Sequence, residues 1–96
     1  MNKEVRFRIL VSGRVQGVWY RRSAKSEADK LGVTGWARNL IDGKVEMICE
    51  GAEENTKAFL EWARTGPFFA HVRDIEVHEE PYQGEFSSFE VRDFGF

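Results

Sequence analysis

Residues 11–21, VSGRVQGVWYR, join two patterns that require different backbone structures. Before this stretch, Val5, Phe7 and Ile9 alternate with other residues at the two-residue period of a half-buried strand. After it, small and apolar residues recur at helical spacing as far as Gly32, a typical helix stop. The stretch therefore predicts a strand, a loop bracketed by two glycines, and a helix that begins at two consecutive arginines.

The rest of the chain continues this alternation of patterns, with Asp42-Gly43 as a tight-turn signal and Gly66-Pro67 as a helix end. In chain order, the further expected elements are a strand over 34–40, a strand from 45 onward, a helix over 53–64, a strand over 72–79 and a short edge strand over 89–92. This order is βαββαβ with one extra strand, or two split βαβ units. It predicts an α+β, ferredoxin-like sandwich, whose antiparallel sheet carries both helices on one face.

This topology places two chain segments at the same edge of the sheet. With the spatial strand order 4-1-3-2, the first two strands run parallel, and their carboxyl ends lie about 10 Å apart, or two strand spacings. The glycine-bracketed loop leaves one of these ends, and Asn39 lies near the other. A phosphate and a water molecule would fit between them.

Composition limits the class of protein. Ninety-six residues, 42% of them hydrophobic, predict one domain, 1–96, with its own core. A single cysteine, Cys49, excludes an intrachain disulfide, and no apolar run reaches the length of a membrane span. We therefore expect a cytoplasmic protein without a membrane partner.

Charge is distributed unevenly along the chain. The net charge is −2, which argues against general nucleic-acid affinity. Residues 1–50 contain ten Lys and Arg against six Asp and Glu, whereas residues 51–96 contain four against ten. An anion site is thus expected in the first half, where the loop lies.

The loop itself resembles a phosphate cradle. Such a loop can direct its backbone N–H groups inward, and the helix that follows adds a partial positive charge at its N-terminus. Arg21 adds a forked cation that matches phosphate oxygens in pairs.

Other candidate groups favour structural roles. His71 and His78 lie in or beside the fourth expected strand, far from the loop, and Cys49 follows the alternation of the third strand. No His, Cys, Asp or Glu residues have metal-ligand spacing, so no metal site is expected. Asn39 has two interpretations from its position alone: a turn former before Asp42-Gly43, or a catalytic amide.

Two motifs resemble the acylphosphatase family, small enzymes with a ferredoxin-like fold. The first is residues 11–21, centred on GRVQGV, and the second is GWARN at 35–39, followed at the family's spacing by Gly43, Val45 and Gly51. Gly66-Pro67 with Ala70 and Val72, and the closing residues 89–92, are also similar to the family. The resemblance covers nearly the whole chain.

The resemblance implies roles for particular residues. The motif arginine, here Arg21, binds the substrate phosphate, and the motif asparagine, Asn39, orients the attacking water. The backbone cradle comprises Arg14, Val15, Gln16, Gly17, Val18, Trp19 and Tyr20. The implied substrate is a small-molecule acyl phosphate, with inorganic phosphate as product and inhibitor. We also expect a monomer without metal or cofactor.

Two positions depart from the family pattern. Tyr20 replaces the usual Phe or Met, so its hydroxyl must find a partner or water. The tail Asp93-Phe94-Gly95-Phe96 passes the usual end, which leaves open any role of a terminal carboxylate near Arg21.

The alternative is a non-enzymatic ferredoxin-like module that binds phosphate or RNA. RNA-binding sheets of this kind present aromatic residues on their central strands. The expected third strand has none, and its open face is predicted to expose Glu46 and Glu50, which would repel a phosphate backbone. The sequence therefore favours the enzyme.

Overall fold

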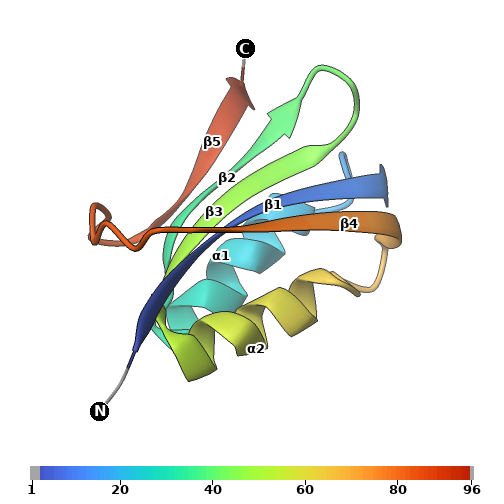
Figure 1. The fold of residues 1–96 in the computed structure, drawn as a ribbon. Coiled ribbons are helices and arrows are strands. Elements are labelled where there is room, and N and C mark those ends of the chain that lie inside the picture. Colours follow the sequence, from blue (N-terminus) through green and yellow to red (C-terminus); the bar gives the residue numbers. More distant parts are fainter. Residues whose placement is uncertain (1–2, 96) are drawn as a thin grey trace.

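The computed structural model describes residues 3–95 as an open-faced sandwich of one sheet and two helices (Figure 1). The elements in chain order are β1 (Glu4–Arg14), α1 (Tyr20–Leu31), β2 (Thr34–Leu40), β3 (Val45–Ala52), α2 (Glu53–Ala63), β4 (His71–Glu80) and β5 (Phe89–Gly95). Both helices cover the same face of the sheet. The predicted α+β, ferredoxin-like architecture is confirmed.

The sheet has the strand order β4-β1-β3-β2-β5. Strands β4, β1, β3 and β2 pair antiparallel, in the predicted spatial order. The short final strand lies at an edge as expected, but it pairs with β2 in parallel, so the complete sheet is mixed. It also extends to Gly95 rather than ending at 92, and Phe96 of the predicted tail lies outside the described residues.

The core lies between the sheet and the helices. Alternate residues of β1 and β3 point into it and are buried, as their sequence alternation predicts: Val5, Phe7, Ile9, Val11, Val45, Met47 and Cys49. Ala24 and Ala28 of α1, with Phe59 and Ala63 of α2, close it from the helix side. Burying each large apolar side chain contributes about 1.5–3 kcal/mol, so this layer stabilises the frame on which the loops are held.

The start of α1 differs by one residue from the expected arginine pair. Trp19 adopts a left-handed conformation (φ 68°) and caps the helix, which therefore begins at Tyr20. Gly32 ends α1 as predicted, with a φ of 69° that glycine adopts without strain.

The open face of the sheet differs from the sequence expectation. Glu46 and Glu50 were expected to be exposed, yet only 5% and 0% of their surfaces are accessible. Glu46 lies beneath Arg8 and Arg38, at 2.8 and 2.6 Å, and Glu50 is bound by Arg6. Because each carboxylate is paired with arginine, it tolerates burial.

The predicted structural roles of the other polar candidates agree with their positions. His71 and His78 are exposed on β4. Cys49 is fully buried, and burial raises the pKa of its thiol to about 12. Of the helices within residues 3–95, none is long and apolar enough to cross a membrane.

Candidate active site

Two glycines with positive φ shape the β1–α1 loop, residues 15–19: Gly13 near the end of β1, and Gly17 within the loop. Gly13 has a φ of +125° and lies so close to the backbone of β4 that a Cβ would collide with the carbonyl of His71. Gly17 has a φ of +73° with open space around it. Among residues 3–95, no backbone N–H group of residues 15–19 donates to a protein acceptor. The loop thus presents a row of donors for a ligand.

Tyr20 fixes the base of this loop. Its ring is buried, and its hydroxyl donates to the carbonyl oxygen of Ala63 at 2.7 Å. A Cβ atom on Gly66 would lie only 2.6 Å from Tyr20 Cε2, so the glycine leaves room for the ring. Burial raises the pKa of the phenol well above its usual value. The hydroxyl has therefore found a protein partner, which ties the start of α1 to the end of α2.

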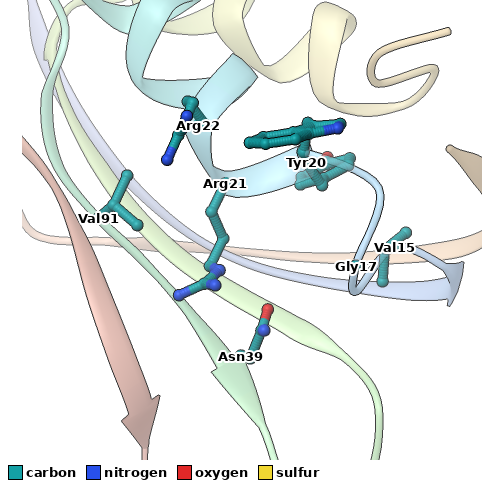
Figure 2. Close-up of a pocket in the computed structure, with 8 residues that line it drawn as sticks. Val15, Gly17, Tyr20, Arg21, Arg22, Asn39 and Val91 are labelled. Atoms are coloured by element: carbon teal, nitrogen blue, oxygen red, sulfur yellow. The ribbon is translucent and has the colours of Figure 1, made fainter. Parts of the chain in front are cut away.

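Arg21 and Asn39 extend toward each other from α1 and β2 (Figure 2). Arg21 Nη1 donates to the carbonyl oxygen of Arg92 in β5 at 2.5 Å, which orients the guanidinium. The two side chains line one pocket of about 270 Å³. The fold brings the two side chains together through β5. Asn39 lies on β2, and Arg92, which binds Arg21, lies on the parallel neighbour β5.

Asn39 sits at the end of β2, opposite Val45 of β3. Its Oδ1 atom is buried, and it has no hydrogen-bond partner within the part of the chain that the structure describes. Buried amide oxygens are normally paired, and an exception calls for an explanation.

The structure brings most of the predicted site residues together. Val15, Gly17, Trp19, Tyr20, Arg21 and Asn39 all line the pocket. Three members of the predicted cradle direct their side chains elsewhere: Arg14 lines a separate hollow with Phe68 and Phe69, Val18 packs against the core, and Gln16 contacts the β2–β3 turn.

Two lining residues were missed from the sequence. Arg22 faces the same pocket and lies over the ring of Trp19, with its Cζ 4.7 Å from the ring centroid. The pair of consecutive arginines was the available signal. Val91 also lines the pocket, and no sequence signal identified it, because its position depends on the parallel pairing of β5.

Acidic and other ligating side chains do not gather at the site. In residues 3–95, no group of three or more His, Cys, Asp and Glu side chains lies where it could hold a metal ion. The charged groups that line the pocket are the guanidiniums of Arg21 and Arg22. The arrangement can bind an anion and hold a polar molecule beside it.

Comparison with known proteins identifies the sequence family. The family model described as Acylphosphatase matches residues 7–91. The chain is 52% identical over 86 residues to an acylphosphatase of Methylococcus capsulatus, covering 90% of this chain and 94% of that protein.

Solved structures agree with the sequence match. An acylphosphatase from Coxiella burnetii superposes with a TM-score of 0.88 at 36% identity, covering 95% of this chain and 94% of that one. An acylphosphatase from Bacillus subtilis gives a TM-score of 0.88 at 39% identity, with 92% and 98% covered. These similarities extend over the whole frame that holds the pocket.

Proposed function

This chain belongs to the acylphosphatase family and is an acylphosphatase, and we propose that Arg21, Asn39 and the backbone of residues 14–20 perform its reaction. The substrate is a small-molecule acyl phosphate, which is hydrolysed to a carboxylate and inorganic phosphate. The observation that carries the proposal is the pocket in which Arg21 faces Asn39 and the amide oxygen of Asn39 lacks a protein partner.

The phosphate is held by Arg21 and the loop. The loop N–H groups donate to its oxygens, and the N-terminus of α1 adds a favourable dipole. Arg21 keeps donors free for the phosphate, because the contact with Arg92 occupies only one N–H of Nη1. These fixed donors neutralise the charge on the equatorial oxygens without reorganising during the reaction.

The attacking water is held by Asn39. Its amide hydrogen-bonds the water and directs one lone pair of the water oxygen toward phosphorus. An amide is not a base at neutral pH, so Asn39 positions the water and does not remove its proton. The phosphoryl group can accept that proton itself.

The bond changes require no further catalytic group. The water oxygen bonds to phosphorus, and the bond between phosphorus and the acyl oxygen breaks. The electron pair leaves with the carboxylate, which is stable at neutral pH and needs no general acid. We therefore propose that the reaction is independent of metal ions, with positioning and electrostatics as its two sources of rate.

We further propose that residues 1–96 act as a single-domain monomer in the cytoplasm, without nucleic-acid or membrane partners. One core cluster spans the sheet and both helices, which supports a single domain. Cys49 is a buried free thiol, which suits a reducing compartment. In the part of the chain that the structure describes, Arg6, Arg8 and Arg38 on the open face are paired with Glu46 or Glu50, which argues against a basic surface for nucleic acid.

The test is phosphate release from a synthetic aromatic acyl phosphate, with and without excess chelator. Activity should survive chelation, and inorganic phosphate should inhibit competitively. Phosphate should also raise Tm, because a ligand that binds only the folded state stabilises it by mass action. A magnesium requirement, or a phosphate series without a thermal shift, would contradict the proposed cradle.

A further inference from the structure

The side chain of Gln16 leaves the phosphate loop and binds the turn that follows Asn39. We propose that Gln16 is a positioning residue, which sets the distance between the phosphate cradle and the amide of Asn39. Its Nε2 atom donates to the carbonyl oxygens of Leu40 at 2.7 Å and of Lys44 at 2.9 Å. This inference rests on the proposed roles of Arg21, Asn39 and the loop.

The chemistry of this contact requires an amide. Only an NH₂ group can donate to two carbonyl oxygens at once from a neutral side chain of this length. A glutamate carboxylate at this position would face the two carbonyl oxygens with another acceptor. A methionine side chain has no hydrogen-bond donor. Because both N–H groups of Gln16 are occupied in this way, its side chain is not available as a phosphate ligand.

The turn does not need Gln16 for its own hydrogen bonds. The carbonyl oxygen of Lys44 already accepts from the N–H of Leu40 at 2.8 Å, and that of Leu40 accepts from Gly43 at 3.2 Å. The contact therefore adds little to closing the turn. What it adds is a link between the loop and residues 24 and 28 positions further along the chain.

The two ends of this link are the two halves of the site. Gln16 lies between Val15 and Gly17, which both line the pocket, and Leu40 directly follows Asn39. A shift of the loop relative to β2 would move the phosphorus away from the line of attack. Errors of about 1 Å in such geometry can cost about 10²-fold in rate.

The first experiment compares Gln16→Met with the wild-type enzyme. We expect kcat to fall about tenfold, while KM and the inhibition constant of inorganic phosphate stay within about twofold, because the loop backbone still binds phosphate. Asp42→Ala is the matched control, since Asp42 supports the same turn through Lys44 N at 3.0 Å but does not contact the loop. It should lower Tm without changing kcat.

The second experiment repeats Gln16→Met in an Asn39→Ala background. If Gln16 acts through Asn39, the second substitution should change kcat by less than about twofold there, because the water is no longer held. An equal loss of kcat in both backgrounds, an unchanged kcat of the single variant, or an equal loss in Asp42→Ala would overturn the positioning role. If Asn39→Ala alone leaves kcat unchanged, the proposed role of Asn39 is refuted. Gln16 would then have no catalytic amide to position.

Discussion

Two regions at opposite ends of β1 place an arginine beside a row of backbone N–H groups, but a carboxylate of the chain fills one of them and the other is open (Figure 1). The filled region, called here the Glu50 nest, consists of the Glu50 carboxylate, the Arg6 guanidinium and the N–H groups of residues 83–85. The open region, called here the substrate cradle, consists of loop residues 14–20 and Arg21.

In the Glu50 nest the three backbone N–H groups and the Arg6 guanidinium already donate to an acceptor of the chain. The carboxylate accepts from the N–H groups of Gln83 at 2.8 Å, Gly84 at 3.2 Å and Glu85 at 3.2 Å, and from Arg6 at 3.2 Å. Burial alone would raise the pKa of Glu50, but the hydrogen bonds from Gln83, Arg6 and the other donors outweigh it, and the pKa lies below its usual value. The nest thereby ties the β4–β5 loop to the sheet.

The substrate cradle has the same parts without the internal anion. Within residues 3–95, the N–H groups of its residues 15–19 have no protein acceptor, and Arg21 is oriented by a neutral carbonyl oxygen rather than a carboxylate. The comparison teaches that an arginine beside a row of N–H groups is structural when a carboxylate of the chain occupies it. It becomes a binding site when the position of the anion is left to a ligand.

The largest expected effect comes from removing the arginine of the cradle. Arg21→Ala should lower kcat/KM by about 10³-fold or more, since one charge-stabilising donor typically accounts for 10²–10³ and Arg21 supplies two. Arg21→Lys should restore little, because a point charge cannot make the paired contact. Stability should change by about 1 kcal/mol or less in a denaturant titration, since the side chain lies outside the core and loses one exposed hydrogen bond, to the carbonyl oxygen of Arg92.

Arg64→Ala is the matched control for this prediction. Arg64 is an exposed arginine at the end of α2 whose side chain hydrogen-bonds only to Glu61 in the described residues. It should leave kcat/KM unchanged. A lysine variant at position 21 with near-normal activity would rule out the forked contact with phosphate.

The next effect concerns the amide that faces the cradle. Asn39→Ala should lower kcat by about 10²-fold. Asn39→Asp should be at least as damaging at pH 7, because its carboxylate faces an anionic substrate. At 4 Å and an effective dielectric constant of about 20, that repulsion is on the order of 4 kcal/mol.

The pH dependence of the aspartate variant separates positioning from base catalysis. As pH falls, the new carboxylate becomes protonated, so its defect relative to the alanine variant should diminish. A pH–rate profile of both variants measures this. An aspartate variant faster than the alanine variant at pH 7 would show that proton removal limits the reaction.

A smaller effect is expected in the filled region, and on stability rather than rate. Glu50→Gln should reduce the free energy of unfolding by about 2 kcal/mol, because an NH₂ group replaces an acceptor that faces N–H donors. Arg6 keeps Glu80 and Glu85 as partners, which limits the loss. Urea titration measures the stability, and kcat should stay near the wild-type value.

The same residue predicts a pH dependence of stability. Since the folded pKa of Glu50 lies below its usual value, its contribution is complete above the unfolded pKa and is lost as pH falls through the folded pKa. The wild-type protein should therefore lose stability more steeply than Glu50→Gln as acid is added below about pH 4.5. If the free energy of unfolding of the two proteins fell in parallel with pH, the proposed contribution of the Glu50 carboxylate would be wrong.

The smallest effect is expected at Gly17 in the cradle. A Cβ there meets nothing within 4 Å, so the cost of Gly17→Val lies in its φ of +73°, which β-branched residues avoid. The strain should weaken inhibition by phosphate about tenfold, as the loop relaxes away from its binding shape. Unchanged phosphate inhibition would show that the loop backbone does not contact the anion.

Much of the frame was predictable because it depends on local periodicity. The alternation of Val5, Phe7 and Ile9 fixes which face of β1 is buried, and Gly32 ends α1 as the pattern indicates. The parallel pairing of β5 with β2 was not predictable, since an edge strand can join its sheet in either direction. For the same reason Val91 was missed at the pocket.

The sequence predicted which residues form the site, but not how their side chains are arranged. The two motifs identified Arg21 and Asn39, and the expected strand order placed their segments at one edge of the sheet; the two side chains line one pocket. The direction of the Gln16 side chain depends on carbonyl oxygens that only the folded turn brings together. The burial of Glu50 likewise depends on donors from residues 83–85, more than thirty positions away in the chain.

The contact between Arg21 and Arg92 has a consequence for the order of folding. It joins residues 71 positions apart, and it forms only after β5 has docked beside β2. Closing such distant contacts is slow relative to the local pairing of β2 with β3. We therefore expect refolding protein to regain its helical circular dichroism before its activity, and the interval between the two should report when β5 docks beside β2.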